Sequence, residues 1–113
     1  MPCRILTPEE AAAESLKNAR LMRLTQFVEE NYMHKIRLAD FAAAEGCSVS
    51  YLSHFIRNTM NQTFQDYVNS VRFRHACKLI AEGKLSMISI SMEAGFSDYR
   101  YFSRAFQEAY GMT

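Results

Sequence analysis

The chain has 113 residues, of which 49% are hydrophobic, and its formal net charge is +1. This composition excludes a disordered polar chain, and no apolar run is long enough to cross a membrane. The near-neutral charge also excludes a polybasic surface, so any binding to nucleic acid must depend on particular residues. Only four glycines and two prolines occur, which favours helices over a turn-rich sheet.

The first predicted helix covers about residues 8–32. Thr7 can act as its N-cap, Pro8 suits the first helical position, and Glu10 completes a capping box. Apolar residues then recur at helical spacing, with a break expected near Arg23. The first half of this helix is rich in Ala and Glu, so we interpret it as a linker or an interdomain extension.

Two short helices follow, over about residues 38–45 and 49–59. Gly46 is a natural stop for the first of them, and Ser48 is a suitable N-cap for the second. Asn61 tolerates a left-handed backbone and is therefore expected to end the second helix.

A longer helix is predicted over residues 64–82, between the capping-box pattern that begins at Thr63 and the stop at Gly83. Its apolar residues are interpreted as one stripe, consisting of Phe64, Tyr67, Val68, Val71, Ala76, Leu79 and Ile80. At about 1.5 Å per residue this helix spans roughly 28 Å.

The last two predicted helices cover about residues 87–94 and 98–110. Ser86 and Ser97 are the expected N-caps, and a glycine follows each helix. The last four predicted helices are thus each bounded on both sides by residues whose chemistry starts or stops helices.

The chain contains an internal repeat. Ala42-(x3)-Gly46-Cys47-Ser48 aligns with Ser91-(x3)-Gly95-Phe96-Ser97 at an offset of 49, whereas Tyr51 to Ile56 aligns with Tyr101 to Phe106 at an offset of 50. One residue is therefore inserted after the second turn's serine. Each copy is a short helix, a glycine turn and a longer helix, which is the helix-turn-helix pattern. Two generic helical hairpins are the alternative interpretation.

At these residues the sequence resembles the AraC/XylS family of transcription regulators. The run from Gly95 to Phe106, followed by Gly111-Met112-Thr113, is similar to the family signature G-F-S-(x3)-Y-F-(x2)-x-F-(x4)-G. Arg72-(x3)-Ala76-(x2)-Leu79-Ile80 resembles the family's linker helix, and Ser48-(x2)-Tyr51-Leu52-Ser53 its first recognition helix. The chain departs from the family pattern at Asn61, where glycine is usual, and at His54, where arginine is common.

The resemblance implies an all-α fold in which two helix-turn-helix subdomains are joined by a long linker helix, a homeodomain-like tandem. The expected division is an N-terminal helical extension or linker (1–23), a first subdomain (24–62), the linker helix (63–83) and a C-terminally incomplete second subdomain (84–113). The effector-binding domain that many members carry is absent from this chain, so the resemblance implies the C-terminal domain of a larger regulator, with a short stand-alone member of the family as the alternative.

The implied function is sequence-specific binding of double-stranded DNA, with two recognition helices in successive major grooves. Outward residues on these helices are the candidate base readers: Ser50, Ser53, His54, Arg57, Tyr99, Arg100, Ser103 and Arg104. The candidate phosphate contacts are Ser48 and Ser97 at helix N-termini, together with Lys35, Arg37, Lys84 and Arg72. For Arg72 an acidic partner is an equal alternative.

An enzyme is not expected, because the sequence has no catalytic constellation, no phosphate-binding glycine loop and no sign of a cofactor or metal. The histidines His34, His54 and His75 are scattered without metal-ligand spacing. The cysteines Cys3, Cys47 and Cys77 form neither a disulfide framework nor a zinc motif, which suits a reducing compartment. We therefore expect a cytoplasmic protein at the bacterial nucleoid.

The rival to DNA binding is a helical protein-interaction module. Met92, Tyr99 and Tyr101 are expected to be exposed and could form a docking surface, for which RNA polymerase is a candidate partner. The two readings differ in their dependence on salt, because a DNA reader loses affinity steeply as the salt concentration rises.

Overall fold

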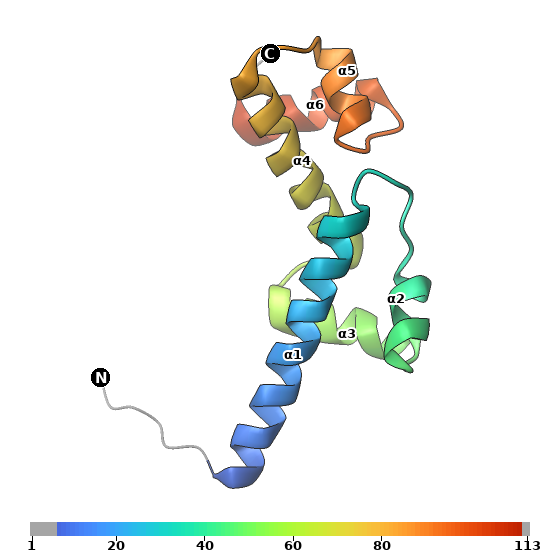
Figure 1. Ribbon diagram of the computed structural model, residues 1–113, viewed down its shortest axis with the longest axis vertical. Helices are drawn as coiled ribbons and strands as arrows, with labels where there is room; N and C mark the ends of the chain where they lie inside the picture. The colour runs from blue at the N-terminus through green and yellow to red at the C-terminus, as the bar shows by residue number, and fades with distance from the viewer. Residues whose placement is uncertain (1–6, 112–113) are drawn as a thin grey trace, which may run out of the picture.

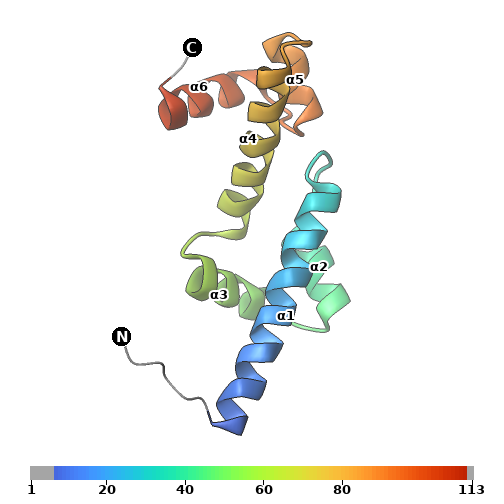
Figure 2. The ribbon, with the colours of Figure 1, turned by 60° about the vertical axis from the view of Figure 1, so that its left-hand side comes forward.

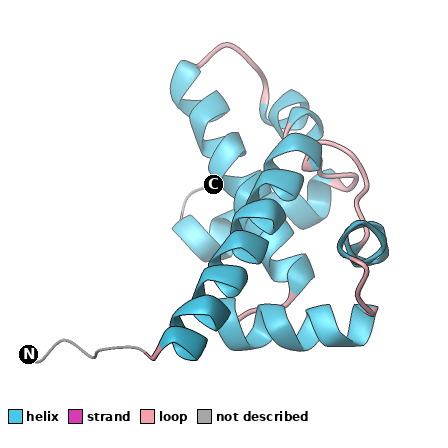
Figure 3. Cartoon of the chain, turned by 60° about the horizontal axis from the view of Figure 1, so that its bottom comes forward, coloured by secondary structure: helices cyan, strands magenta, loops and turns pink. Residues whose placement is uncertain are grey.

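The computed structural model describes residues 7–111, which form six helices and no strand (Figures 1 and 3). These helices are α1 (Pro8–Asn31), α2 (Leu38–Glu45), α3 (Val49–Met60), α4 (Phe64–Glu82), α5 (Met87–Glu93) and α6 (Tyr99–Tyr110). The predicted all-α class is confirmed. Cys3, Met112 and Thr113, which entered the sequence analysis, lie outside the described residues. Among the described helices, none has the length and apolar character of a membrane span.

The molecule is elongated, with one helical unit at each end of α4 (Figure 1). The first unit contains α1, α2 and α3, and the second contains α5 and α6. The radius of gyration is 17.2 Å, and the molecule measures 53 × 38 × 21 Å. A compact domain of this length has a radius of gyration of about 13 Å. The two units are therefore held apart along α4 rather than folded onto one another.

Local chemistry sets the start of α1 and the end of α3 as predicted. The Thr7 hydroxyl accepts a hydrogen bond from the Glu10 backbone N–H, and the Glu10 carboxylate accepts one from the Thr7 N–H. Asn61 ends α3 in the left-handed conformation, with a φ of 56°. The break expected near Arg23 is wrong, because α1 continues through this position without glycine or proline and buries Leu24 just beyond it.

Each unit has its own hydrophobic core. The first core contains Leu24 and Val28 of α1, Phe41 and Ala42 of α2, Leu52 and Ile56 of α3, and Val68 and Val71 of α4. The second contains Ala76 of α4, Ile90, Ala94 and Phe96 around α5, and Phe102 and Phe106 of α6. The two sets of buried residues have no member in common, and α4 is the only helix that contributes to both.

The apolar residues of α4 do not form the single stripe that the sequence suggested. Phe64, Tyr67, Val68 and Val71 contact the first core, whereas Phe73, Ala76, Cys77, Leu79 and Ile80 contact the second. At 3.6 residues per turn, the mean directions of these two sets differ by roughly 150° around the helix axis. The linker helix thus completes one core with each of two faces, and this division fixes the rotation of one unit against the other.

Candidate nucleic-acid interface

The first helix-turn-helix consists of α2, the turn at Gly46 and α3. Gly46 has a φ of 68°, and its N–H reaches back to carbonyl oxygens of α2. The Ser48 hydroxyl then accepts a hydrogen bond from the Tyr51 N–H at 3.1 Å, which confirms Ser48 as the N-cap of α3. Leu52 and Ile56 are fully buried, so α3 keeps one face in the core and leaves the opposite face to solvent.

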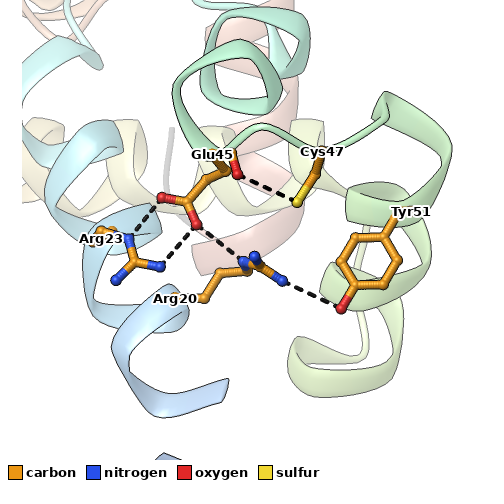
Figure 4. Close-up of polar contacts among 5 residues, drawn as sticks. All are labelled: Arg20, Arg23, Glu45, Cys47 and Tyr51. Atoms are coloured by element: carbon orange, nitrogen blue, oxygen red, sulfur yellow. Dashed lines mark hydrogen bonds and ion pairs between the residues drawn. The ribbon is translucent and has the colours of Figure 1, made fainter. Parts of the chain in front are cut away.

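A cluster of charged residues on α1 fixes the last residue of α2 (Figure 4). The Glu45 carboxylate accepts hydrogen bonds from Arg20 Nε at 3.0 Å and from Arg23 Nε and Nη2 at 2.6 and 2.9 Å. These hydrogen bonds, that of Arg23 foremost, lower the pKa of Glu45 to about 2. Arg20 also donates to the Tyr51 hydroxyl on α3 at 3.2 Å. The three helices of the unit are therefore joined just before the turn into α3.

Sequence reasoning missed this cluster. Arg20 and Arg23 are three residues apart, and hence on one face of α1, and Glu45 directly precedes the turn glycine. That pattern was available in the sequence, but it did not indicate which acidic residue the two arginines would meet. The first half of α1 was interpreted as a linker, whereas Arg20 belongs to the packing of the first unit.

The second helix-turn-helix consists of α5, the turn at Gly95 and α6. Ser91 is 1% exposed, and its hydroxyl donates a hydrogen bond to the Ile88 carbonyl oxygen. Phe96 follows the turn and is buried in the second core. Phe102 and Phe106 anchor α6 on the same side as Leu52 and Ile56 anchor α3 in the repeat.

The predicted cap of α6 is wrong. Asp98, not Ser97, is the N-cap, and its carboxylate accepts hydrogen bonds from the N–H groups of Arg100 and Tyr101. The inserted residue of the repeat explains the shift, because Asp98 stands three residues before Tyr101 as Ser48 stands three before Tyr51. Ser97 is exposed and lies in the turn, so its hydroxyl is not the group that starts α6.

All eight candidate base readers are exposed in the structure, on the parts of α3 and α6 that face away from the two cores: Ser50, Ser53, His54, Arg57, Tyr99, Arg100, Ser103 and Arg104. Figures 1 and 2 show α3 and α6 running in the same direction across the two ends of α4. Their N-terminal ends lie beside α2 and α5, respectively. The second helices of the two units are thus presented in matching orientations.

The candidate phosphate contacts fall into two groups. Ser48, Arg37 and Lys84 are exposed on the two units, and Arg37 forms a long ion pair of 3.8 Å with Asp40. Lys35, Arg72 and Ser97 instead line one surface groove between the units, together with apolar residues that include Met33 and Met92. The structure therefore brings together three residues that were predicted separately.

The Arg72 guanidinium hydrogen-bonds to the backbone rather than to an acidic side chain. Its Nε donates to the Tyr32 carbonyl oxygen and its Nη2 to the His34 carbonyl oxygen, both at 2.9 Å. Burial lowers the pKa of the Arg72 guanidinium, although arginine stays charged at neutral pH. The acidic partner considered for Arg72 is thus replaced by two backbone carbonyls of the segment that joins α1 to α2.

Within residues 7–111, His, Cys, Asp and Glu side chains form no group of three or more that could hold a metal ion. Two helix-turn-helix units with exposed polar faces on their second helices define instead a tandem helix-turn-helix protein of the nucleic-acid-binding class. Comparison with known proteins agrees with this class. A model of the helix-turn-helix domain family matches residues 41–113.

Among similar proteins, the virulence regulon transcriptional activator VirF of Yersinia enterocolitica is 30% identical over 103 residues, which cover 91% of this chain and 38% of VirF. The C-terminal domain of the two-component response regulator yesN from Fusobacterium nucleatum is similar in structure, with a TM-score of 0.74 and 28% identity over 85% of this chain and 99% of that one. A probable AraC family transcriptional regulator from Rhodopseudomonas palustris has the same fold, with a TM-score of 0.76, 20% identity and coverage of 84% and 90%.

The chain belongs to the AraC/XylS family of transcription regulators and corresponds to the DNA-binding domain of that family. The family consists of regulators rather than enzymes, in agreement with the sequence analysis. The chain spans 38% of the length of VirF, so the similarity concerns this domain alone.

Proposed function

We propose that this chain binds specific sequences of double-stranded DNA by inserting α3 and α6 into successive major grooves. The observation that carries this proposal is the matching orientation of the two helices, with eight polar or aromatic side chains exposed on them (Figures 1 and 2). The linker helix is about 28 Å long, and one turn of DNA measures about 34 Å. Because these lengths are similar, α3 and α6 lie near successive major grooves. Bending of the DNA would supply the remaining difference.

Within this proposal, the arginines are the strongest base readers. Arg100 and Arg104 lie one helical turn apart on α6, and each can hold guanine O6 and N7 with two hydrogen bonds. On α3 the weaker or water-mediated readers Ser50, Ser53 and His54 stand beside Arg57. The first unit is thus expected to discriminate bases less strongly than the second, and the target site need not be palindromic.

The phosphate contacts are assigned to the rest of the same surface. The groove that contains Lys35, Arg72 and Ser97 lies between the units, where the DNA backbone would pass from one major groove to the next. Arg72 takes part through Nη1, because Nε and Nη2 already donate to carbonyl oxygens. Arg37 and Lys84 flank the two units, and the N-terminus of α3 at Ser48 offers a further phosphate site.

The proposal extends to the organisation of the protein. The proposed division is a first subdomain (24–62), the linker helix (63–83), a second subdomain (84–113) and an extension (1–23), whose Arg20 and Arg23 contact the first subdomain. A cytoplasmic location at the nucleoid follows from DNA binding. Docking to RNA polymerase, and attachment to an effector-binding domain, stay predictions from the sequence.

Selection of bound duplexes from a random pool tests this function. We expect a motif of two different half-sites about one DNA turn apart. Binding to the selected duplex should weaken steeply with salt, because each neutralised phosphate contributes a slope of about −0.9 in log K against log salt concentration. A pool that returns no motif, together with no salt-dependent binding of random DNA, would contradict the proposal.

A second candidate function is a protein-interaction module without DNA binding. It is favoured by one observation, the exposure of Met92 and Ile88 one turn apart on α5, at 68% and 56%. Exposed apolar residues of this kind suit a protein partner better than a phosphate backbone. The salt titration separates the two functions, because a pure docking module has no DNA affinity to lose.

A further inference from the structure

The two units meet at a junction built from the segment that follows α1. Arg72, in the middle of α4, donates to the Tyr32 and His34 carbonyl oxygens, both at 2.9 Å. Because the guanidinium is a rigid planar fork, two such hydrogen bonds fix both the position and the orientation of this segment. A part of the first unit is thereby held against the linker helix.

The turn of the second unit presses against the same point. A Cβ atom placed on Gly95 would lie 2.3 Å from the Tyr32 carbonyl oxygen, 3.0 Å from Met33 Cα and 3.1 Å from Arg72 Nε. Only a residue without a side chain permits this approach. Gly95 therefore serves two purposes, since its φ of 98° is also one that other residues rarely adopt.

Side-chain contacts with α4 surround this point. The Tyr32 ring stacks on the His75 ring, with centroids 4.0 Å apart, and His75 Nε2 lies 2.9 Å from a Glu29 carboxylate oxygen. Burial, and after it the neighbouring Lys78 and Arg74, lower the pKa of His75. On the other side of the junction, Asn69 donates to the Tyr101 hydroxyl of α6 at 2.9 Å.

The glycines of the other turns have no such neighbours. A Cβ atom on Gly46, Gly83 or Gly111 would meet no atom within 4 Å, although all three glycines have a φ between 65° and 69°. Their conformation explains why glycine suits these turns. The contact with the other unit is particular to Gly95.

We propose that Gly95 is a positioning residue that fixes the angle between the two helix-turn-helix units and thereby sets the spacing of the half-sites. This inference rests on the two-groove function proposed above. An added methyl group must displace either the Tyr32 carbonyl or the turn between α5 and α6. Displacement of the Tyr32 oxygen breaks its hydrogen bond with Arg72, whereas displacement of the turn moves the second unit away from the junction.

Half-site spacing is sensitive to such a joint for a geometric reason. One additional base pair rotates a half-site by about 35° and moves it by about 3.4 Å. A protein with a rigid junction can bind the shifted half-site only if the DNA bends or twists, which costs free energy. A protein with a flexible junction can instead rotate one unit to match the shifted half-site. With the contact between Gly95 and Tyr32 intact, the chain should prefer one half-site spacing strongly. Without this contact, the chain should accept several spacings with similar affinity.

The DNA-free test compares the orientations of the two units by residual dipolar couplings measured on the 113-residue chain. In the native chain one alignment tensor is expected to describe both α1–α3 and α5–α6. Gly95→Ala should require two different tensors. Its helix content, measured by circular dichroism, should stay at the native value. The matched control is Gly83→Ala, at the end of the linker helix and at positive φ but with no atom within 4 Å of an added Cβ, which should keep a common tensor.

Arg72→Gln provides a second variant that leaves the Gly95 turn unchanged, in case Gly95→Ala does not fold. It removes the planar fork and is likewise expected to separate the tensors. A common tensor in each folded variant of this pair would overturn the inference.

The DNA arm measures affinity for duplexes whose half-site spacing varies by one or two base pairs. The native chain should lose about tenfold in affinity for each added base pair, and Gly95→Ala about threefold or less, as the cost of distorting DNA is shared with the joint. A native chain that prefers no spacing would contradict the two-groove function, and the tensors would still decide the role of Gly95. An equally narrow preference in Gly95→Ala would overturn that role.

Discussion

At the scale of single residues, one carboxylate determines how the first recognition helix is held. Glu45 is the last residue of α2, and its partners Arg20 and Arg23 come from α1 (Figure 4). The side chain of Glu45 is 7% exposed, so the carboxylate depends on these partners rather than on water. Arg20 also donates a hydrogen bond to the Tyr51 hydroxyl on α3. The position of α3 therefore depends on the negative charge of Glu45, which acid can neutralise.

This arrangement predicts a pH dependence of stability. The pKa of Glu45 is about 2 in the folded chain and 4.5 without these neighbours. The lowered pKa stabilises the fold above about pH 4.5, and this contribution is lost as the pH falls towards 2. Glu45→Gln should therefore lower Tm by several degrees at pH 7, and the difference from the native chain should vanish near pH 2. Thermal unfolding across this range measures it, and a constant difference would contradict the assignment.

A second prediction at this scale concerns base reading by Arg104, which is exposed on α6. Arg104→Ala should relax the preference at one position of the selected DNA motif, with a loss of about 1–3 kcal/mol in discrimination. Repeated selection from the random pool measures this loss. Lys84→Ala is the matched control, because loss of a phosphate contact should weaken all duplexes alike. An unchanged motif in Arg104→Ala would remove this residue from the base readers.

At the scale of elements, the start of α6 depends on the residue that the repeat inserts. Asp98 accepts hydrogen bonds from two N–H groups in the first turn of α6, whereas Ser48 accepts one in α3. A carboxylate at this position also complements the positive end of the helix dipole. The two recognition helices thus begin in the same register although their caps differ in chemistry and charge.

The cap predicts a difference between two neighbouring residues. Asp98→Ala should destabilise the chain by about 1 kcal/mol, because two N–H groups of α6 lose their acceptor. Ser97→Ala should change stability much less, since Ser97 is exposed in the turn and does not cap the helix. Urea unfolding of both variants tests this order. Equal losses of unfolding free energy in the two variants would contradict the assignment of Asp98 as the main cap of α6.

At the scale of the whole molecule, two cores share one helix. Val68 and Val71 belong to the first core and Ala76 to the second, and the full sets of apolar α4 residues that contact the two cores face roughly 150° apart. The separation explains the elongated shape, and it means that each unit depends on its own buried residues. The junction at Gly95 then restricts how these nearly independent units are oriented.

Because each unit has its own core, a substitution in one core should destabilise mainly the unit that contains it. Phe102 is fully buried in the second core, and Phe102→Ala should cost about 3–5 kcal/mol, a large part of the stability of so small a unit. Amide exchange should accelerate in α5 and α6 while α2 and α3 stay protected. Leu52→Ala in the first core is the mirrored control, with the opposite pattern expected. Simultaneous loss of protection in both units would show that the chain unfolds as one body.

The sequence by itself determined the helices, their caps at Thr7 and Ser48, the left-handed stops and the repeat, because these features depend on neighbours within a few residues. It also indicated which faces of α3 and α6 stay exposed, since burial follows helical periodicity. Only the tertiary structure decided the partner of Glu45, the two faces of α4 and the contact between Gly95 and Tyr32. These join residues 20 or more positions apart in the chain, and local chemistry does not specify which distant group a side chain will meet.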